Sequence, residues 1–180
     1  MITIFEGARN SGKTFLANSY AKQTNLPIYK FEFSGWFSEL MIPDDDPVTH
    51  YFALGKEAML LQLNRDGFLS DFILDRGFLT VLTWGIISDR ITHQLALQQL
   101  NLFRDKGLLG NLKIILVEGT NPSSEARNKD LWDFRENTSQ EKETLLNLVS
   151  TLQLIEPDIQ IVKLTNDFTD KTSSNLTELI

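Results

Sequence analysis

The chain has 180 residues, of which 42% are hydrophobic and 23% charged, so its length and composition suit one compact globular domain. It has no cysteine, which excludes disulfides, cysteine-ligated zinc and thiol nucleophiles. The net charge of −7 and the pI of about 4.8 argue against non-specific binding along nucleic acid, which needs clustered basic residues. No apolar run has membrane-spanning length and the start lacks a basic signal region, so we expect a cytoplasmic protein.

Residues 7–14 read GARNSGKT and fit the phosphate-loop pattern G-x-x-x-x-G-K-[ST]. The apolar run at 1–5 predicts a buried strand before this loop, and the breaker-free run at 14–21 predicts a helix after it. Backbone N–H groups at the start of such a helix bind anions, and glycines allow a close approach. We therefore expect a nucleoside triphosphate to bind at Gly7, Asn10, Ser11, Gly12, Lys13 and Thr14, with the Thr14 hydroxyl as a ligand of Mg²⁺; the alternative is a chance glycine-rich turn before a core helix.

The middle of the chain predicts further alternating elements. In order, these are a strand at 28–33, a helix at 49–65, a strand at 71–75 and a helix from Phe78 onward. Ser88 or Asp89 is expected to cap a long helix that continues through Lys106. The apolar stripe of this helix would contain Ile91, Leu95 and Leu102.

The last third of the chain predicts two more strands, at 112–117 and 159–164, and a short helix at 173–180. A polar segment at 121–137 precedes a capping box at 138–141, which predicts the start of a helix. Its apolar positions are Leu145, Leu148, Val149 and Leu152. Alternating strands and helices predict an α/β fold in one domain, 1–180, with a five-stranded parallel sheet flanked by helices and ligands at the carboxyl ends of the strands.

Two further groups of residues suit phosphoryl transfer. Asp75 and Arg76 follow the end of a buried strand. There the Asp75 carboxylate could ligate Mg²⁺ or accept a proton, and the Arg76 guanidinium could bind a phosphate. The alternative is that the two side chains form a local ion pair. The segment 121–137 would suit a lid in which Arg127 and Arg135 neutralise the transferred group. The alternative for that segment is an exposed charged loop.

These residues resemble thymidylate kinase and its nucleoside and nucleotide kinase relatives. The matching stretches are 2–7 leading into the phosphate loop, Asp75 and Arg76 followed by Leu79, Thr80 and Trp84, and the segment 136–141. The resemblance covers most of the chain in order, but only the phosphate loop is highly specific. It implies a P-loop NTPase fold of the nucleotide-kinase type that transfers the γ-phosphoryl group of ATP to a deoxynucleoside monophosphate or a nucleoside.

The resemblance also implies roles for single residues. Lys13 and Thr14 would serve ATP and Mg²⁺, Asp75 would lie near the metal and the acceptor, and Arg76 would bind the acceptor phosphate. Thr80 and Trp84 would line the nucleoside pocket.

On the helix before the Asp75–Arg76 strand, the family carries an aromatic residue that stacks on the base and, four positions later, an arginine that reads it. Phe52 and Lys56 have that spacing in this chain. Arg65 is a competing candidate for the arginine, and an ordinary core position is the alternative for Phe52.

The chain departs from the family at two places. Arg9 replaces the aspartate by which thymidylate kinases contact the sugar 3′-hydroxyl, which suggests an acceptor with a modified 3′-oxygen or an extra phosphate. The family's Arg-Glu-Pro-Gly stretch is reduced to residues 31–35, where Glu32 with Trp36 resembles the catalytic glutamate and tryptophan of deoxynucleoside kinases. Some viral relatives phosphorylate a hydroxymethylated pyrimidine within DNA, which would suit Arg9.

The leading hypothesis is therefore an ATP- and Mg²⁺-dependent kinase acting on a small nucleotide acceptor. The second is the same chemistry on a nucleotide within DNA, which the acidic pI disfavours and Arg9 favours. The third is a nucleotide-binding or NTPase module that gates a partner. By analogy with the family, the chain could form a homodimer. We expect no association with a membrane. If the chain is encoded by a virus, its location would be the cytoplasm of the host.

Overall fold

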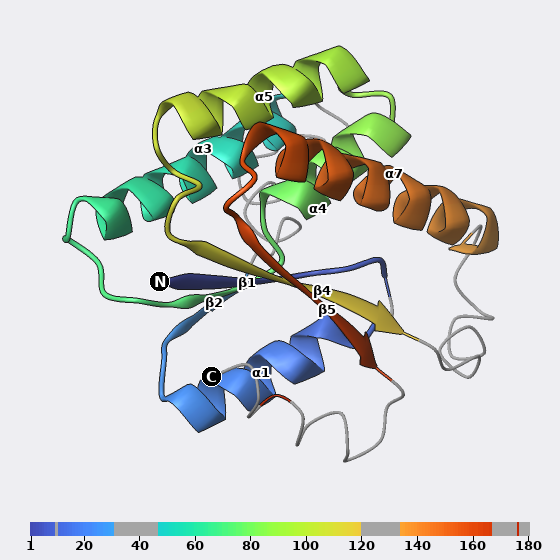
Figure 1. The fold of residues 1–180 in the computed structure, drawn as a ribbon. Helices are drawn as coiled ribbons and strands as arrows, with labels where there is room; N and C mark the ends of the chain where they lie inside the picture. The colour runs from blue at the N-terminus through green and yellow to red at the C-terminus, as the bar shows by residue number, and fades with distance from the viewer. Residues whose placement is uncertain (10, 31–46, 120–133, 167–175, 177–180) are drawn as a thin grey trace.

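The computed structural model describes residues 1–9, 11–30, 47–119, 134–166 and 176. Within these ranges, a five-stranded parallel sheet carries helices on both faces (Figure 1). The strands are β1 (Ile2–Glu6), β2 (Ile28–Lys30), β3 (Ile73–Asp75), β4 (Leu112–Gly119) and β5 (Gln160–Asn166), in the order β2-β3-β1-β4-β5. The predicted fold class is therefore confirmed.

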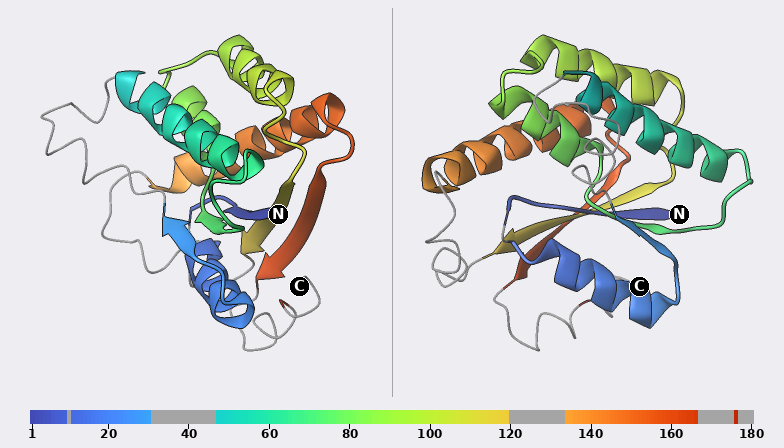
Figure 2. Two further views of the ribbon diagram at one scale, coloured as in Figure 1. Left: turned by 90° about the vertical axis from the view of Figure 1, so that its left-hand side faces the viewer. Right: turned by 180° about the vertical axis from the view of Figure 1, so that it is seen from behind.

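The helices cover the two faces of the sheet unequally (Figures 1 and 2). Helix α1 (Lys13–Thr24) lies on one face, and α3 (Pro47–Arg65), α4 (Phe78–Ile87), α5 (His93–Asp105) and α7 (Phe134–Ile155) lie on the other. Because both faces are covered, all five residues of β1 are buried, which explains its continuous apolar run. None of the described helices is long and apolar enough to cross a membrane.

The strand registers bring the functional segments to one edge of the sheet. Phe5 pairs with Asp75, so the end of β3 lies beside the end of β1. On the other side, Glu6 pairs with Leu116, and β4 in turn pairs with β5 as far as Asn166. The phosphate loop leaves β1 at this carboxyl edge, which is where parallel sheets bind ligands.

The long helix predicted through Lys106 is wrong, because the chain breaks into two helices. Helix α4 ends at Ile87, Ser88 follows it as the C-cap, and Asp89 has a φ of +55°. Helix α5 begins instead after Thr92, whose hydroxyl accepts the Leu95 N–H at 3.2 Å. The predicted stripe is also wrong at Leu102, which is exposed, since the buried residues of α5 are Ala96, Leu100 and Phe103.

The predicted capping box at 138–141 is wrong as well, because α7 already begins at Phe134 and Thr138 lies inside it. The four apolar residues predicted for this helix are all buried: Leu145, Leu148, Val149 and Leu152. Of the predicted lid, 121–133 lies outside the described residues and 134–137 belongs to α7. The end of the predicted second strand, 31–33, and the closing helix at 173–180 also lie outside, apart from the buried Leu176.

Candidate active site at the carboxyl edge of the sheet

The phosphate loop joins the end of β1 to the start of α1 with the geometry that its glycines predict. Gly12 has a φ of +82°, a left-handed conformation that favours glycine. A Cβ at Gly7 would lie 2.5 Å from the carbonyl oxygen of Val117, so only glycine lets the loop pass so close to β4. The Asn166 side chain at the end of β5 donates to the Ser11 carbonyl oxygen at 2.9 Å. The described part of the loop is thus fixed by two neighbouring strands.

The Lys13 ammonium group lies inside this loop. It is buried and donates to the carbonyl oxygen of Ala8 at 3.0 Å. Burial, and after it the nearby Arg76 charge, lower the pKa of Lys13 to about 8, against the opposing effect of the Glu141, Glu6 and Asp75 carboxylates. A buried cation enclosed by backbone is suited to an anionic ligand.

Thr14 and Asp75 connect the phosphate loop to β3. The Thr14 hydroxyl, at the start of α1, donates to Oδ1 of Asp75 at 3.2 Å. Asp75 is buried, although it is charged and ends a strand. A hydroxyl and a carboxylate oxygen suit Mg²⁺, which usually retains several waters rather than using an all-protein cage. Among the described residues, no group of three or more His, Asp or Glu side chains could hold a metal ion.

Arg76 leaves β3 in a left-handed conformation, with a φ of +75°. Its backbone N–H donates to the carbonyl oxygen of Phe5 at 3.0 Å, which ties the β3 end to β1. Its charge reaches three neighbours: it lowers the pKa of Lys13 and of Arg9 and counters the burial that raises the pKa of Glu141. The structure therefore gathers three cations, Arg9, Lys13 and Arg76, around the Glu141 carboxylate.

Arg9 lies between an aromatic ring and a carboxylate. Its guanidinium carbon is 3.4 Å from the centre of the Trp84 ring, and its Nε is 3.7 Å from Oε2 of Glu141. The Arg9 backbone N–H also donates to Oε1 of Glu141 at 3.2 Å. Helices α4 and α7 thus both contact the phosphate loop through one of its side chains.

Thr80 makes its contact with β1, and its role in the nucleoside pocket stays a prediction. It is buried, and its hydroxyl donates to Oε2 of Glu6. The Thr80 hydroxyl therefore donates its hydrogen bond to another buried side chain of the protein. Trp84, one turn later on α4, instead contacts Arg9.

The two candidates for the base-reading cation, Lys56 and Arg65, lie at different positions along α3. Arg65 bonds to Asp66 at 2.9 Å and to the carbonyl of Lys106, and the neighbouring Asn64 accepts from Asn111 at 3.2 Å. Since Asn111 directly precedes β4, Arg65 lies at the opposite edge of the sheet from the phosphate loop. Phe52, which is 50% exposed, is not a core residue, so Phe52 and Lys56 remain the candidates.

Several predicted residues cannot be placed in this site. Asn10, Glu32 and Arg127 lie outside the described residues, and Arg135 is placed only by its backbone in the first turn of α7.

Sequence reasoning missed three carboxylates that the structure brings to this region: Glu6, Glu57 and Glu141. Glu57 carried a signal, because it continues the buried helical positions of Ala53, Leu54 and Leu61. The signal for Glu6 was a charged residue at the end of an otherwise mostly apolar strand. Glu141 had been assigned to a capping box, and no local pattern connects it to a loop 132 positions away.

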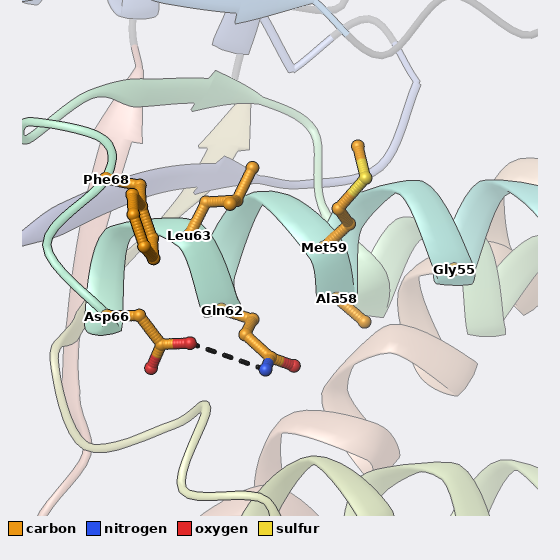
Figure 3. A pocket seen from close by; sticks show the side chains of 7 residues that line it. All are labelled: Gly55, Ala58, Met59, Gln62, Leu63, Asp66 and Phe68. Carbon is orange, nitrogen blue, oxygen red and sulfur yellow. Dashed lines mark hydrogen bonds between the residues drawn. The ribbon is translucent and has the colours of Figure 1, made fainter.

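An open hollow on the surface of α3 lies apart from this site (Figure 3). It has a volume of about 470 Å³ and is lined by Gly55, Ala58, Met59, Gln62, Leu63, Asp66 and Phe68. None of these residues belongs to the phosphate loop or to the end of β3.

Comparison with known proteins gives matches of structure only, since no family model and no curated protein sequence matches the chain. The YorR protein of Bacillus subtilis, solved with phosphorylated GDP, is 17% identical, with a TM-score of 0.62 over 99% of this chain and 95% of its own. Deoxyadenosine kinase of M. mycoides, solved with dCMP and dCDP, is 14% identical, with a TM-score of 0.61 over 99% and 97%. Thymidylate kinase of Ehrlichia chaffeensis is 12% identical, with a TM-score of 0.66 over 99% and 97%.

The chain therefore has the fold of the P-loop nucleoside and nucleotide kinases, thymidylate kinase among them. At this level of identity the resemblance indicated by the sequence motifs is confirmed for the fold.

Proposed function

We propose that the protein is a P-loop phosphotransferase that moves the γ-phosphoryl group of ATP to a nucleotide or nucleoside, with a deoxynucleoside monophosphate as the first candidate. The observation that carries this proposal is the 3.2 Å hydrogen bond between the Thr14 hydroxyl and Asp75, which joins the phosphate loop to the end of β3. Arg76 follows directly and adds a cation on the same side. A module that only binds a nucleotide would not need an arginine placed for an acceptor phosphate.

Each residue has a distinct role in this proposal. Lys13 binds the β- and γ-phosphates of ATP, and Thr14 and Asp75 hold Mg²⁺, which when bound neutralises charge on the transferred group. Arg76 binds the acceptor phosphate. The acceptor oxygen bonds to the γ-phosphorus as the bond to the β,γ-bridging oxygen breaks, and Asp75 is placed to accept the acceptor's proton if that acceptor is a hydroxyl.

The two alternatives differ in the acceptor. Arg9 is the feature that favours a nucleotide within DNA, but Glu141 and Trp84 already contact its guanidinium, and the net charge of −7 opposes a polyanion. An NTPase module that gates a partner would release phosphate without an acceptor. Transfer assisted by Arg127 and Arg135 in a lid, a homodimer and a cytoplasmic location remain predictions.

The test is incubation with γ-labelled ATP and Mg²⁺ against deoxynucleoside monophosphates, ribonucleotides, nucleosides, and plain or hydroxymethylated DNA. The proposal expects label in a small nucleotide or nucleoside, loss of all transfer in Lys13→Ala, and a selective rise in the acceptor KM in Arg76→Ala. Label in DNA alone would support the second alternative, and label only in free phosphate the third.

A further inference from the structure

Two buried carboxylates meet at Gly77, the residue that joins Arg76 to helix α4. A Cβ built on Gly77 would lie 2.8 Å from Oε1 of Glu57 and 3.0 Å from Oε1 of Glu6. Glu6 comes from the end of β1, and Glu57 from the middle of α3. Three segments therefore converge on Gly77: β1, which leads into the phosphate loop, α3, which carries Phe52 and Lys56, and the end of β3 with Asp75 and Arg76.

Glu6 takes the place of an N-cap for α4. Gly77, the N-cap residue, has no side chain to bond the free N–H groups of the first turn. Oε1 of Glu6 accepts the Leu79 N–H at 3.1 Å, and Oε2 accepts the Thr80 N–H at 3.2 Å as well as the Thr80 hydroxyl. A negative charge at a helix N-terminus is favourable, so this arrangement suits an ionised Glu6.

Glu57 lies beside Glu6 without comparable partners. It is fully buried, and among the described residues neither of its carboxyl oxygens has a hydrogen bond of good geometry. Burial raises the pKa of Glu57 well above its ordinary value, and the adjacent Glu6 raises it further, whereas the Phe78 N–H has a smaller opposite effect. Two such acids so close together are compatible with one negative charge between them.

We propose that Glu6 and Glu57 are positioning residues that hold the first turn of α4, and with it Asp75 and Arg76, in register with the phosphate loop. The inference rests on the proposed function for its catalytic consequence. A purely structural role would predict only lost stability. Positioning predicts that loosening this contact impairs the acceptor step, since a misplacement of about 1 Å can cost about a hundredfold in rate.

Glu57→Ala, Glu57→Gln and Glu6→Gln test this, with Leu61→Ala as the matched control. Leu61 is buried on the same helix one turn further from Gly77, so its truncation lowers stability without touching the junction. Glu57→Ala should raise the acceptor KM about tenfold or more and leave the ATP KM unchanged, whereas Leu61→Ala should leave both unchanged. Glu57→Gln should retain the wild-type KM values, because an amide has the shape of a neutral carboxyl group.

Amide hydrogen exchange provides a readout that needs no turnover. Exchange at Leu79 and Thr80 should be faster in Glu57→Ala and Glu6→Gln than in Leu61→Ala, and unchanged in Glu57→Gln. Equal exchange in Glu57→Ala and the control would overturn the inference, as would a Glu57→Gln variant that behaves like Glu57→Ala. If the wild type transfers phosphoryl to no acceptor while the exchange differences hold, only the proposed function fails.

Discussion

The Lys13 ammonium group is a buried charge enclosed by the backbone of the phosphate loop. Its pKa of about 8, lowered mainly by burial, leaves it protonated at neutral pH, so the folded protein bears the desolvation cost of the cation. Charges buried in this way are typical of sites in which a ligand supplies the compensating charge.

Replacing Lys13 with methionine should therefore separate activity from stability. We expect turnover to fall by at least about a hundredfold, because one stabilising group of the transferred phosphoryl is lost. The melting temperature should be unchanged or higher, because the variant buries an apolar chain instead of a cation. Steady-state kinetics and a thermal melt measure the two effects, and a melting temperature that falls with the activity would contradict this account.

Arg9 and Glu141 should be energetically coupled, because they share an ion pair and a backbone hydrogen bond across 132 positions. A double-mutant cycle with Arg9→Ala and Glu141→Gln should give a coupling free energy of about 1 kcal/mol in denaturant unfolding. Additivity within about 0.3 kcal/mol would show that the contact contributes nothing to stability. Trp84 should report the same contact, since Arg9→Ala uncovers its ring and should change its fluorescence.

At the scale of elements, α4 differs from α5 in how its N-terminus is satisfied. Helix α5 has a local cap, Thr92, three residues before the N–H it accepts. Helix α4 uses a side chain from β1, more than 70 positions earlier in the chain. This makes the start of α4 dependent on tertiary packing, and Gly77 is the residue that leaves room for it.

Gly77→Ala should therefore destabilise the protein, with Gly55→Ala as its matched control. The added methyl group would lie 2.6 Å from Cγ2 of Ile4 as well as against both carboxylates, which predicts a loss of about 1–3 kcal/mol. At Gly55, on α3, nothing lies within 4 Å, and alanine should be neutral or should stabilise the helix by about 0.5–1 kcal/mol. Denaturant unfolding distinguishes the two, and equal midpoints would refute the crowding at Gly77.

For the molecule as a whole, the buried acids predict an unusual dependence of stability on pH. Burial raises the pKa of Glu6 to about 7, against the opposing hydrogen bonds of Thr80 and Leu79 and the charge of Lys13. Glu57 on α3 is the other acid that faces it, and its pKa is raised as well. A raised carboxyl pKa means that the folded state binds protons more tightly, so the stabilisation is present below about pH 4.5 and is lost as the pH rises towards 7.

Comparison of the wild type with Glu6→Gln isolates this effect. The free energy of unfolding of the wild type should fall relative to that of the variant by on the order of 3 kcal/mol between pH 4.5 and pH 7. Lys13 does not interfere, since its pKa of about 8 places its own contribution at higher pH. Denaturant unfolding at several pH values provides the measurement, and parallel curves would show that Glu6 titrates normally.

Much of the fold followed from local patterns in the chain. The phosphate loop, its flanking strand and helix, and the exit of Asp75 and Arg76 from a strand depend on residues within a few positions of one another. The alternation of strands and helices then limits the sheet to parallel order with right-handed crossovers. The errors fell on helix boundaries at Ser88 and Thr138, where residues that are typical of N-caps do not begin a helix: Ser88 is the C-cap of α4, and position 138 lies inside α7.

The amino-acid sequence by itself determined the anion-binding loop and the class of sheet that presents it, because both arise from short-range backbone preferences and from hydrophobic periodicity. Only the tertiary structure decided that Arg9 contacts Trp84 and Glu141, and that Glu6 and Glu57 meet at Gly77. These contacts join residues up to 132 positions apart, and their energies depend on burial and on neighbouring charges that exist only after the chain has folded.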